Sequence, residues 1–261
     1  MKRSRLPWIA AGAALLFLYL PILVLVANSF NASRFGGSWQ GFSLAWYARL
    51  FHEPEIWRAA RTTLVIALSA TALSGLLGTT AALALHRYGK SRLQRAHFAL
   101  IYTPLIMPEI LMGIGLLMVF AAAGLPLGMG TIFLAHVTFC LSFVAMVVLA
   151  RLQDFDESII EASRDLGAGA WTTFRKIRLP LIGPGVAAGC LLAFTLSVDD
   201  FVITFFVAGP GSTTLPIRIY SMIKHGSPPL INALSTILLV VTFAALALSQ
   251  RLSRPAAGGG V

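Results

Sequence analysis

Long apolar runs alternate with short polar connections along the chain. The runs lie at about 6–27, 62–85, 99–122, 130–150, 184–207 and 231–250. Each is close to the roughly 20 residues that an α-helix needs to cross the hydrocarbon core of a bilayer. The pattern therefore predicts an all-α membrane protein with six transmembrane helices.

The first apolar run permits two interpretations, a signal peptide or a membrane helix. The basic residues Lys2, Arg3 and Arg5 precede it, as they would in either case. A signal-peptide core usually has about 7 to 15 residues, which is shorter than this run, and no small-x-small cleavage site follows cleanly. We therefore expect residues 6–27 to stay as a transmembrane helix.

Lysine and arginine are unevenly distributed between the two sets of connections that alternate along the chain. One set holds 14 of these residues, in segments 1–5, 86–98, 151–183 and 251–261. The other set holds 6, in segments 28–61, 123–129 and 208–230. Because short positive loops stay in the cytoplasm, both termini and the loop 157–184 are predicted to be cytoplasmic. Loops 28–61 and 208–230 are predicted to be extracytoplasmic, with a short amphipathic helix at 44–51.

The composition agrees with a membrane protein and changes the meaning of the charge. Hydrophobic residues make up 57% of the chain and charged residues 11%, whereas about 25% charged residues is usual in soluble proteins. The net charge of +10 would suggest nucleic acid in a soluble chain. Here the basic residues flank apolar runs and are explained by membrane orientation, so we expect contact with membrane lipid and no nucleic-acid partner.

Sequence patterns of catalysis and metal binding are absent. No G-x-x-x-x-G-K loop followed by Ser or Thr occurs, and the histidines are scattered at positions 52, 86, 97, 136 and 225. Cys140 and Cys190 both lie inside apolar runs, where a small buried hydrophobe is the default interpretation. We expect no catalytic, metal-binding or cofactor-binding residues, and no ATP hydrolysis by this chain.

The polar insert 161–184, EASRDLGAGAWTTFRKIRLPLIGP, separates two of the apolar runs. Its first part places Ile159, Ser163 and Leu166 at helical spacing and then reaches Gly167, which suits a left-handed helix end. Its second part places Trp171, Phe174 and Ile177 three residues apart, and Leu179-Pro180 is expected to end it, because proline has no amide proton. The insert is therefore predicted to form two short helices with a bend between them.

The same insert resembles the EAA loop of the permease subunits of ABC importers. The matching residues are Glu161, Ala162, Ser163, Gly167, Ile177, Leu179 and Pro180. Ser163 stands where that family usually has alanine, and it is small enough to leave the packing intact. The alternative is an ordinary amphipathic cytoplasmic loop. The resemblance implies the type I ABC importer permease (MetI-like) fold, with a single permease domain over 1–261 and a core at about 62–250.

The resemblance also implies where the chain resides and which partners it has. In that family the loop is a coupling helix that docks on a separate ATPase subunit. The implied partners are a second homologous permease subunit, two ATPase subunits that bind ATP and Mg, and an extracytoplasmic substrate-binding protein. The implied location is the bacterial inner membrane, with several spans.

The run 197–220, SVDDFVITFFVAGPGSTTLPIRIY, resembles the spermidine and putrescine branch of these permeases, especially its second permease subunit. This implies a polyamine substrate. Relatives that move iron, thiosulfate or phosphonates share parts of the pattern, so those substrates stay open.

Three carboxylates lie within the predicted spans, where a charge is costly unless it is paired or lines a cavity. Glu109 follows two prolines, Pro104 and Pro108, which are expected to loosen the helix midway. It is a candidate for the substrate pathway, and the alternative is a carboxyl group bonded to His136 or to backbone freed by the prolines.

Asp199 and Asp200 are the other two carboxylates. Adjacent residues of a helix point about 100° apart, so one is expected to face a cavity and the other a neighbouring helix. No lysine or arginine lies inside a predicted span to pair with them. Acids without a matching cation suit a cationic substrate, and Phe201 and Phe205 offer cation–π faces. The alternative is that these rings face lipid or core.

Two other classes of membrane protein remain as rivals. A proton-coupled transporter or channel would use Glu109, Asp199 and Asp200 as a relay. Such folds commonly carry internal repeats, and no convincing repeat relates the two halves of this chain. A membrane scaffold without transport activity would leave the intramembrane acids unexplained.

Overall fold

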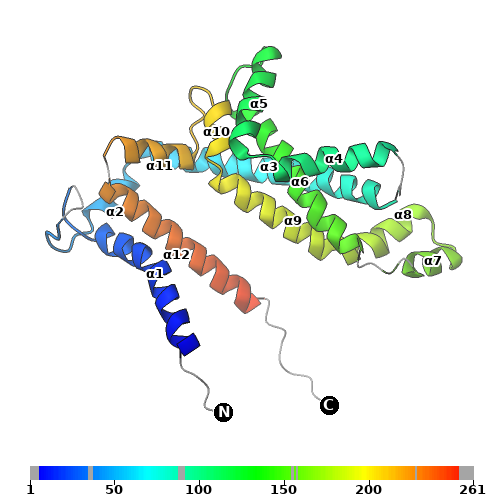
Figure 1. The fold of residues 1–261 in the computed structure, drawn as a ribbon, viewed down its shortest axis with the longest axis horizontal. Coiled ribbons are helices and arrows are strands. Elements are labelled where there is room, and N and C mark those ends of the chain that lie inside the picture. The colour runs from blue at the N-terminus through cyan, green and yellow to red at the C-terminus, as the bar shows by residue number, and fades with distance from the viewer. Residues whose placement is uncertain are drawn as a thin grey trace. The chain divides into compact units, whose positions relative to one another are not determined.

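A computed structural model describes residues 6–34, 38–87, 92–153, 156, 158–226 and 228–252. In this part the regular secondary structure is helical, apart from one isolated β-bridge between Asn31 and Phe42. The elements, labelled in Figure 1, are α1 (Leu6–Ser29), α2 (Ala45–Phe51), α3 (Pro54–Arg87), α4 (Arg92–Ile106), α5 (Glu109–Ala122), α6 (Met129–Gln153), α7 (Ser158–Asp165), α8 (Ala170–Thr173), the π-helix η1 (Phe174–Arg178), α9 (Leu179–Asp199), α10 (Val202–Val207), α11 (Leu215–Lys224) and α12 (Pro228–Leu252). The all-α class is therefore confirmed.

The chain divides into two compact units. Unit 1 comprises Met1–Ile56 and Ile219–Val261, and unit 2 comprises Trp57–Arg218. In unit 1, α12 packs against both α1 and α2. The short helix α2 occurs where the sequence predicts one, and its Tyr47 hydroxyl lies 2.6 Å from the Ser29 hydroxyl at the end of α1.

Helix α6 lies at the centre of unit 2 and packs against α9, α4 and α10. Its buried apolar side chains form the middle of the hydrophobic core, together with residues of α9 and α10. Small residues let α9 approach closely. A Cβ on Gly189 would lie 3.2 Å from the Cα of Val144, and the Cys140 thiol lies 3.4 Å from the Ala193 carbonyl oxygen. Close contact of this kind is how helices associate in a membrane, where lipid is as apolar as the side chains.

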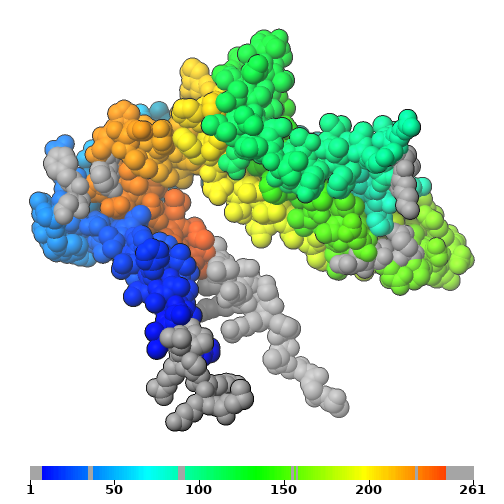
Figure 2. Space-filling view, viewed as in Figure 1, coloured from blue at the N-terminus to red at the C-terminus, as the bar shows by residue number. Residues whose placement is uncertain are grey.

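Figure 2 shows α5 as a ridge that projects from the surface formed by α4 and α6. Figure 1 places α7 and α8 at one end of unit 2, and α5 and α10 toward the other. Helices α5 and α10 pack together, and Gly113 of α5 leaves room for the Phe206 ring, which a Cβ there would approach to 2.7 Å.

Most of the predicted spans correspond to apolar helices. In the described residues, four helices are long and apolar enough to cross a membrane: Trp8–Ser29, Pro54–Arg87, Met129–Gln153 and Ala170–Asp199. A bent pair of helices, Arg92–Ile106 and Glu109–Ala122, makes up to five. The run 231–250 falls within α12, whose described apolar part is Pro229–Ala244. The count of six spans and the single domain over 1–261 stay predictions.

The cytoplasmic location of the termini also stays a prediction. Residues 1–5, with their three basic side chains, and residues 253–261 lie outside the described residues. The same is true of Glu157, the first residue of the loop 157–184.

The expectation of a single helix over 99–122, only loosened midway, is wrong, because the helix breaks at Met107 and Pro108. The axes of α4 and α5 differ by 116° across this break. Pro104 lies inside α4 without ending it, whereas Pro108 has an extended backbone with ψ of 132°. Proline has no amide donor and disfavours a helical residue before it, which explains a break at the second proline.

The expectation of one continuous helix over 184–207 is also wrong. Helix α9 ends at Asp199, and α10 begins at Val202. Between them Asp200 has an extended backbone with ψ of 121°. No proline or glycine lies at this break, so its cause lies in the contacts of the Asp200 side chain.

Candidate functional site

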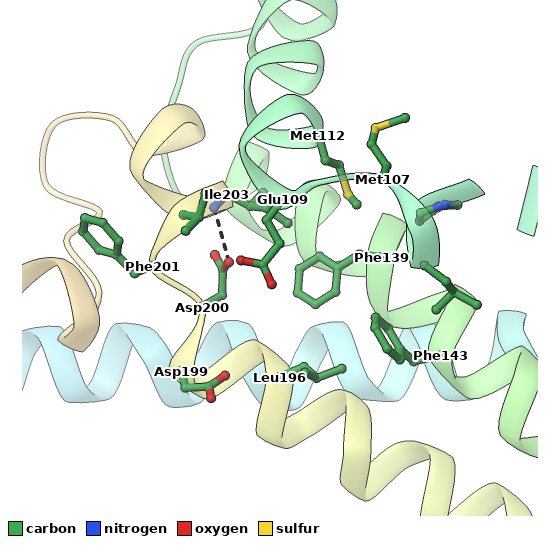
Figure 3. Close-up of a pocket in the computed structure, with 13 residues that line it drawn as sticks. Met107, Glu109, Met112, Phe139, Phe143, Leu196, Asp199, Asp200, Phe201 and Ile203 are labelled. Carbon is green, nitrogen blue, oxygen red and sulfur yellow. Dashed lines mark hydrogen bonds between the residues drawn. The ribbon is translucent and has the colours of Figure 1, made fainter. Parts of the chain in front are cut away.

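A pocket of about 360 Å³ lies in unit 2 beside the two helix breaks. Figure 3 shows the residues that line it, which come from α4, α5, α6, the end of α9 and the start of α10. All three intramembrane carboxylates line the pocket, namely Glu109, Asp199 and Asp200. The chain thus brings together acids that are some 90 positions apart in the sequence.

The helix breaks explain why the acids reach the pocket. Glu109 is the first residue of α5, directly after the Pro108 break, and a carboxylate is favoured at a helix N-terminus. Asp199 is the last residue of α9. Both side chains are exposed, and Figure 3 shows the Glu109 carboxylate pointing from α5 toward the break that holds Asp200.

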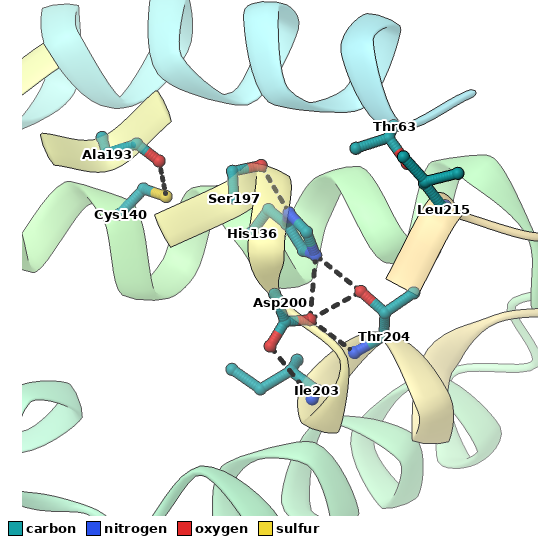
Figure 4. Close-up of polar contacts among 9 residues, drawn as sticks. All are labelled: Thr63, His136, Cys140, Ala193, Ser197, Asp200, Ile203, Thr204 and Leu215. Atoms are coloured by element: carbon teal, nitrogen blue, oxygen red, sulfur yellow. Dashed lines mark hydrogen bonds and ion pairs between the residues drawn. The ribbon is translucent and has the colours of Figure 1, made fainter. Parts of the chain in front are cut away.

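Asp200 is held by the start of α10. Its Oδ1 accepts a hydrogen bond from the Ile203 amide at 3.2 Å, and its Oδ2 accepts one from the Thr204 amide at 2.8 Å. The Thr204 hydroxyl also donates to Oδ2 at 2.6 Å (Figure 4). These bonds satisfy amides that begin a helix and have no partner within it. The Asp200 side chain therefore stabilises the start of α10, on one side of the break.

A buried histidine of α6 completes this network. His136 Nε2 lies 3.3 Å from Asp200 Oδ2 and 2.9 Å from the Thr204 hydroxyl, and Nδ1 lies 2.6 Å from the Ser197 hydroxyl (Figure 4). The side chains of His136 and Asp200 are only 1% and 6% exposed. A proton on Nε2 donates to Asp200, and Nδ1 then accepts from Ser197, so the imidazole is satisfied on both sides. His136 thus ties α6 to α9, to α10 and to the break between them.

These contacts correct three expectations. The polar partners of His136 are Ser197, Thr204 and Asp200 in the described part of the chain, so the proposed bond from Glu109 to His136 is wrong. Asp200 does have a partner that can carry positive charge, a histidine, which a count of lysine and arginine misses. The two aspartates differ in environment because the helix breaks between them, and not because adjacent helical residues diverge by 100°.

Of the two aromatic candidates, Phe201 and Phe205, one lines the pocket. Phe201 lines the pocket, whereas Phe205 packs against Phe201 with ring centroids 5.5 Å apart and the rings tilted by 43°, and it is not among the described lining residues. Sequence reasoning missed Phe139 and Phe143 of α6, which line the pocket. Together with His136 they have the spacing i, i+3, i+7, which is one face of a helix. That pattern was available in the sequence.

The coupling candidates lie in α7, in the turn at Gly167, in η1 and at the start of α9. Asp156 accepts a hydrogen bond from the Ser158 amide at 2.9 Å, where α7 begins. Hydrogen bonds from the Ser158 side chain and amide hold the pKa of Asp156 below its usual value. Helix α7 ends as the sequence predicts, with Gly167 in the left-handed region at φ of 81°. The Gly167 amide donates to Arg164 and the Ala168 amide to Ser163, which together form a Schellman motif.

Ser163 joins the two short helices. Its hydroxyl lies 2.9 Å from the Thr173 hydroxyl of α8, and both side chains are buried. The predicted apolar face is only partly correct. Ser163 is buried, but Ile159 is 43% exposed and Leu166 is 89% exposed, while Ile160 is buried instead. The buried face of α7 is therefore formed by Ile160 and Ser163, and Leu166 follows the end of the helix.

The expectation that Leu179-Pro180 ends the second helix is wrong. The π-helix η1 runs to Arg178, and α9 continues directly from Leu179 with Pro180 in its first turn. Proline is tolerated in a first turn, and the π-helix, although rare, occurs mostly as a single turn within a longer α-helix. The result is one helical segment, Ala170–Asp199, of 30 residues. It joins the coupling candidates to the acidic pocket without an intervening loop.

Several coupling candidates are accessible on the surface of this element. Glu161 and Ala162 of α7 are exposed, as are Leu179 and Pro180 of α9, and Ile177 is half-buried. Beside them, Trp171 is 69% exposed and stacks on Phe174, with ring centroids 5.8 Å apart. Exposed tryptophan and leucine on a short helix are suited to contact another protein surface.

The network predicts a specific stability effect. Replacing His136 with alanine leaves the buried Asp200 carboxylate without its imidazole partner, which we expect to lower the free energy of unfolding by about 3 kcal/mol. Thermal unfolding of the purified protein in detergent measures this. Asp199→Asn is the matched control, because Asp199 is exposed and should unfold as the wild type does. Equal stability of His136→Ala and wild type would contradict a structural role for the network.

Comparisons with known proteins agree with this geometry. Residues 74–255 match the family described as binding-protein-dependent transport system inner membrane component. The chain is 44% identical to the spermidine/putrescine transport system permease protein PotC of Escherichia coli strain K12, over 91% of this chain and 90% of that protein. It is 45% identical to the putrescine transport system permease protein PotI of the same strain, over 85% of this chain and 82% of that protein.

A solved structure shares the fold at low sequence identity. The structure is that of the bacterial alginate ABC transporter in complex with an alginate pentasaccharide-bound periplasmic protein, with a TM-score of 0.76 and 17% identity, covering all of this chain and 98% of the matched chain. The fold is thus that of ABC importer permeases. The chain belongs to the family of binding-protein-dependent transport system inner membrane components, which are permease subunits of ABC importers and not enzymes.

Proposed function

We propose that this chain is a permease subunit of an ATP-driven importer for polyamines such as spermidine and putrescine. One observation supports a cationic substrate: Glu109, Asp199 and Asp200 line a single pocket whose described lining residues include no lysine or arginine. A pocket of this kind in a membrane protein attracts a cation. The names of the curated relatives, which are spermidine/putrescine and putrescine permeases, support the same class.

The chemistry of the pocket suits an extended amine. A polyamine carries ammonium groups separated by methylene chains, so it needs separate carboxylates with apolar surface between them. Glu109 and Asp199 are exposed and come from different helices, which suits them to bind different ammonium groups. The rings of Phe139, Phe143 and Phe201 offer apolar contact to the methylenes and cation–π faces to the amines.

Asp200 has a different role in this proposal. Its two oxygens already accept bonds from α10, and one of them also faces His136. It adds negative potential to the pocket and fixes the break that presents Asp199. We therefore assign direct contact with the substrate to Glu109 and Asp199, and a positioning role to Asp200.

Transport by alternating access requires partners that this chain does not supply. The proposed assembly contains a second homologous permease, two ATPase subunits that bind ATP and Mg, and an extracytoplasmic substrate-binding protein. The exposed surface of α7 and α8 would dock on an ATPase subunit. Because Ala170–Asp199 is one helical segment, a movement of α8 reaches Asp199 without passing through a loop. The break at Asp200 is then the point at which the movement opens or closes the pocket.

Uptake in cells tests the function. In bacteria that lack this gene, restoring it should restore uptake of radiolabelled spermidine and putrescine, but not of a neutral amino acid used as a control. Uptake should continue with a proton uncoupler while ATP is maintained, and should stop when ATP is depleted. Prompt loss with the uncoupler alone would favour a proton relay through the acids. If polyamine uptake did not depend on the gene, the assignment of polyamines as the substrate would be wrong.

The acids should differ in their effect on uptake. Asp199→Asn and Glu109→Gln should each lower spermidine uptake about tenfold, the equivalent of one charged hydrogen bond of about 1.5 kcal/mol, without loss of protein from the membrane. Glu53→Gln is the control, because Glu53 lies between α2 and α3 and does not line the pocket. Unchanged uptake in both pocket variants would remove Glu109 and Asp199 from the pathway.

The bend in the coupling element gives a second prediction. Gly167→Ala forces a side chain into the left-handed region at a cost of about 1 to 2 kcal/mol, which should disturb the angle between α7 and α8. We expect at least about a fivefold drop in substrate-stimulated ATP hydrolysis by the reconstituted complex. Gly169→Ala is the matched control, since Gly169 has a φ of −67° that alanine adopts readily. Equal rates of ATP hydrolysis in the two variants would show that the bend at Gly167 is not needed for coupling.

A further inference from the structure

Helices α7 and α8 lie at one end of unit 2 (Figure 1). A second pocket, whose described lining is basic, lies beside α7 and η1. It has a volume of about 340 Å³. The described residues that line it are His86 and Arg87 at the end of α3, Arg164 of α7 and Arg178 of η1. Three guanidinium groups from three elements therefore converge on one cavity. The acidic pocket and the coupling motif use none of these residues.

An apolar recess adjoins the basic pocket. It has a volume of about 240 Å³ and shares the three arginines with the basic pocket, and its other lining residues are Ile160, Ala170, Thr173 and Phe174. Ile160 and Thr173 are buried, and the hydrogen bond between the Ser163 and Thr173 hydroxyls fixes this wall. The two cavities together form one amphipathic site, with a basic mouth and an apolar interior.

The chemistry of this site selects an amphipathic anion. Arginine presents a planar fork of donors that binds phosphate oxygens in pairs, and three such groups favour a phosphate over a single carboxylate. A free inorganic anion would use the basic mouth and leave the apolar recess without a function. A phosphate that carries an apolar group would use both.

The position of the site favours a membrane lipid as the source of that phosphate. Arg87 is the last residue of α3, a candidate span, and it follows the apolar run 62–85 by two positions. An arginine directly after the apolar part of a span lies at the membrane surface. Basic pockets between helices on the cytoplasmic side of a membrane bind anionic headgroups.

We propose that the arginine pocket binds the headgroup phosphate of an anionic phospholipid such as phosphatidylglycerol, with the glycerol and the start of an acyl chain in the apolar recess. The bound lipid would join the end of α3 to α7 and η1, which move with the ATPase subunits in the proposed mechanism. The lipid site rests on membrane location alone and does not depend on the identity of the transported substrate.

Lipid binding to the purified transporter complex tests this site. The complex, assembled with its partner subunits in detergent, is titrated with phosphatidylglycerol or with phosphatidylcholine, and retained lipid is measured by native mass spectrometry. Wild type should retain phosphatidylglycerol selectively. Arg164→Gln with Arg178→Gln should weaken this binding about thirtyfold, or about fivefold for each arginine removed. Circular dichroism and size-exclusion chromatography establish that the variant is folded and assembled.

A second pair of variants separates the pocket from general basic charge. Arg175→Gln with Lys176→Gln removes the same charge from the same element, but these residues are exposed and are not among the described lining residues. This pair should bind phosphatidylglycerol within about twofold of wild type, since a surface charge outside the pocket contributes little. Equal weakening by both pairs, or no weakening by Arg164→Gln with Arg178→Gln, would overturn the proposal. If that variant does not assemble, Arg87→Gln alone takes its place, with an expected loss of about fivefold.

Two further outcomes distinguish the source of the phosphate and the kind of occupant. Inorganic phosphate at millimolar concentration should not displace bound phosphatidylglycerol, because it cannot occupy the recess. Full displacement of phosphatidylglycerol by inorganic phosphate would show that the site binds a free anion, and the lipid proposal would be wrong. If the arginine variant releases the ATPase subunits and still retains phosphatidylglycerol, the pocket receives an acidic group of a protein partner instead. Polyamine uptake is measured separately, so a negative result in the lipid-binding experiment does not affect the proposed transported substrate.

Discussion

The contact between Asp200 and His136 determines how the acidic pocket is built. In a membrane a break in a helix exposes backbone amides and carbonyls that lipid cannot satisfy, and a carboxylate at the same depth needs a partner within the protein. Asp200 meets both requirements, because it accepts hydrogen bonds from the first amides of α10 and lies beside the imidazole of α6. The break therefore belongs to the native structure, and α6 fixes its place.

One continuous helical segment, Ala170–Asp199, connects the acidic pocket to the coupling candidates. The end of α9 carries Asp199 into the pocket, and the other end of the same helical segment begins at Ala170 beside the bend at Gly167. The π-helical turn before Pro180 keeps the segment continuous where a proline in a helix interior would disrupt it. Helix α9 packs closely on α6 at Gly189, so any movement of the segment would follow the surface of α6. In the proposed mechanism, this continuous segment links the surface of α7 and α8 to the pocket.

Charge is separated within unit 2 in a way that matches the proposed roles. The acidic pocket lies beside the helix breaks, and the basic pocket lies at the end of α3 beside α7 and η1. The first suits a cation that must cross the membrane, and the second suits an anion that stays at its surface. Ser163, which replaces the usual alanine of the coupling motif, supports the wall of the second pocket through its bond to Thr173.

The sequence by itself determined the features that depend on local properties of the chain. The length of the apolar runs predicted the helical membrane class, and the left-handed turn at Gly167 followed from the residue that best tolerates it. The pairing of Asp200 with His136 was decided only by the tertiary structure, because the two lie on different helices and meet only after folding. The break between α9 and α10 follows from that pairing, since no proline or glycine marks it. Continuation of the helix through Pro180 likewise depended on a change of helical register, which single-residue preferences do not encode.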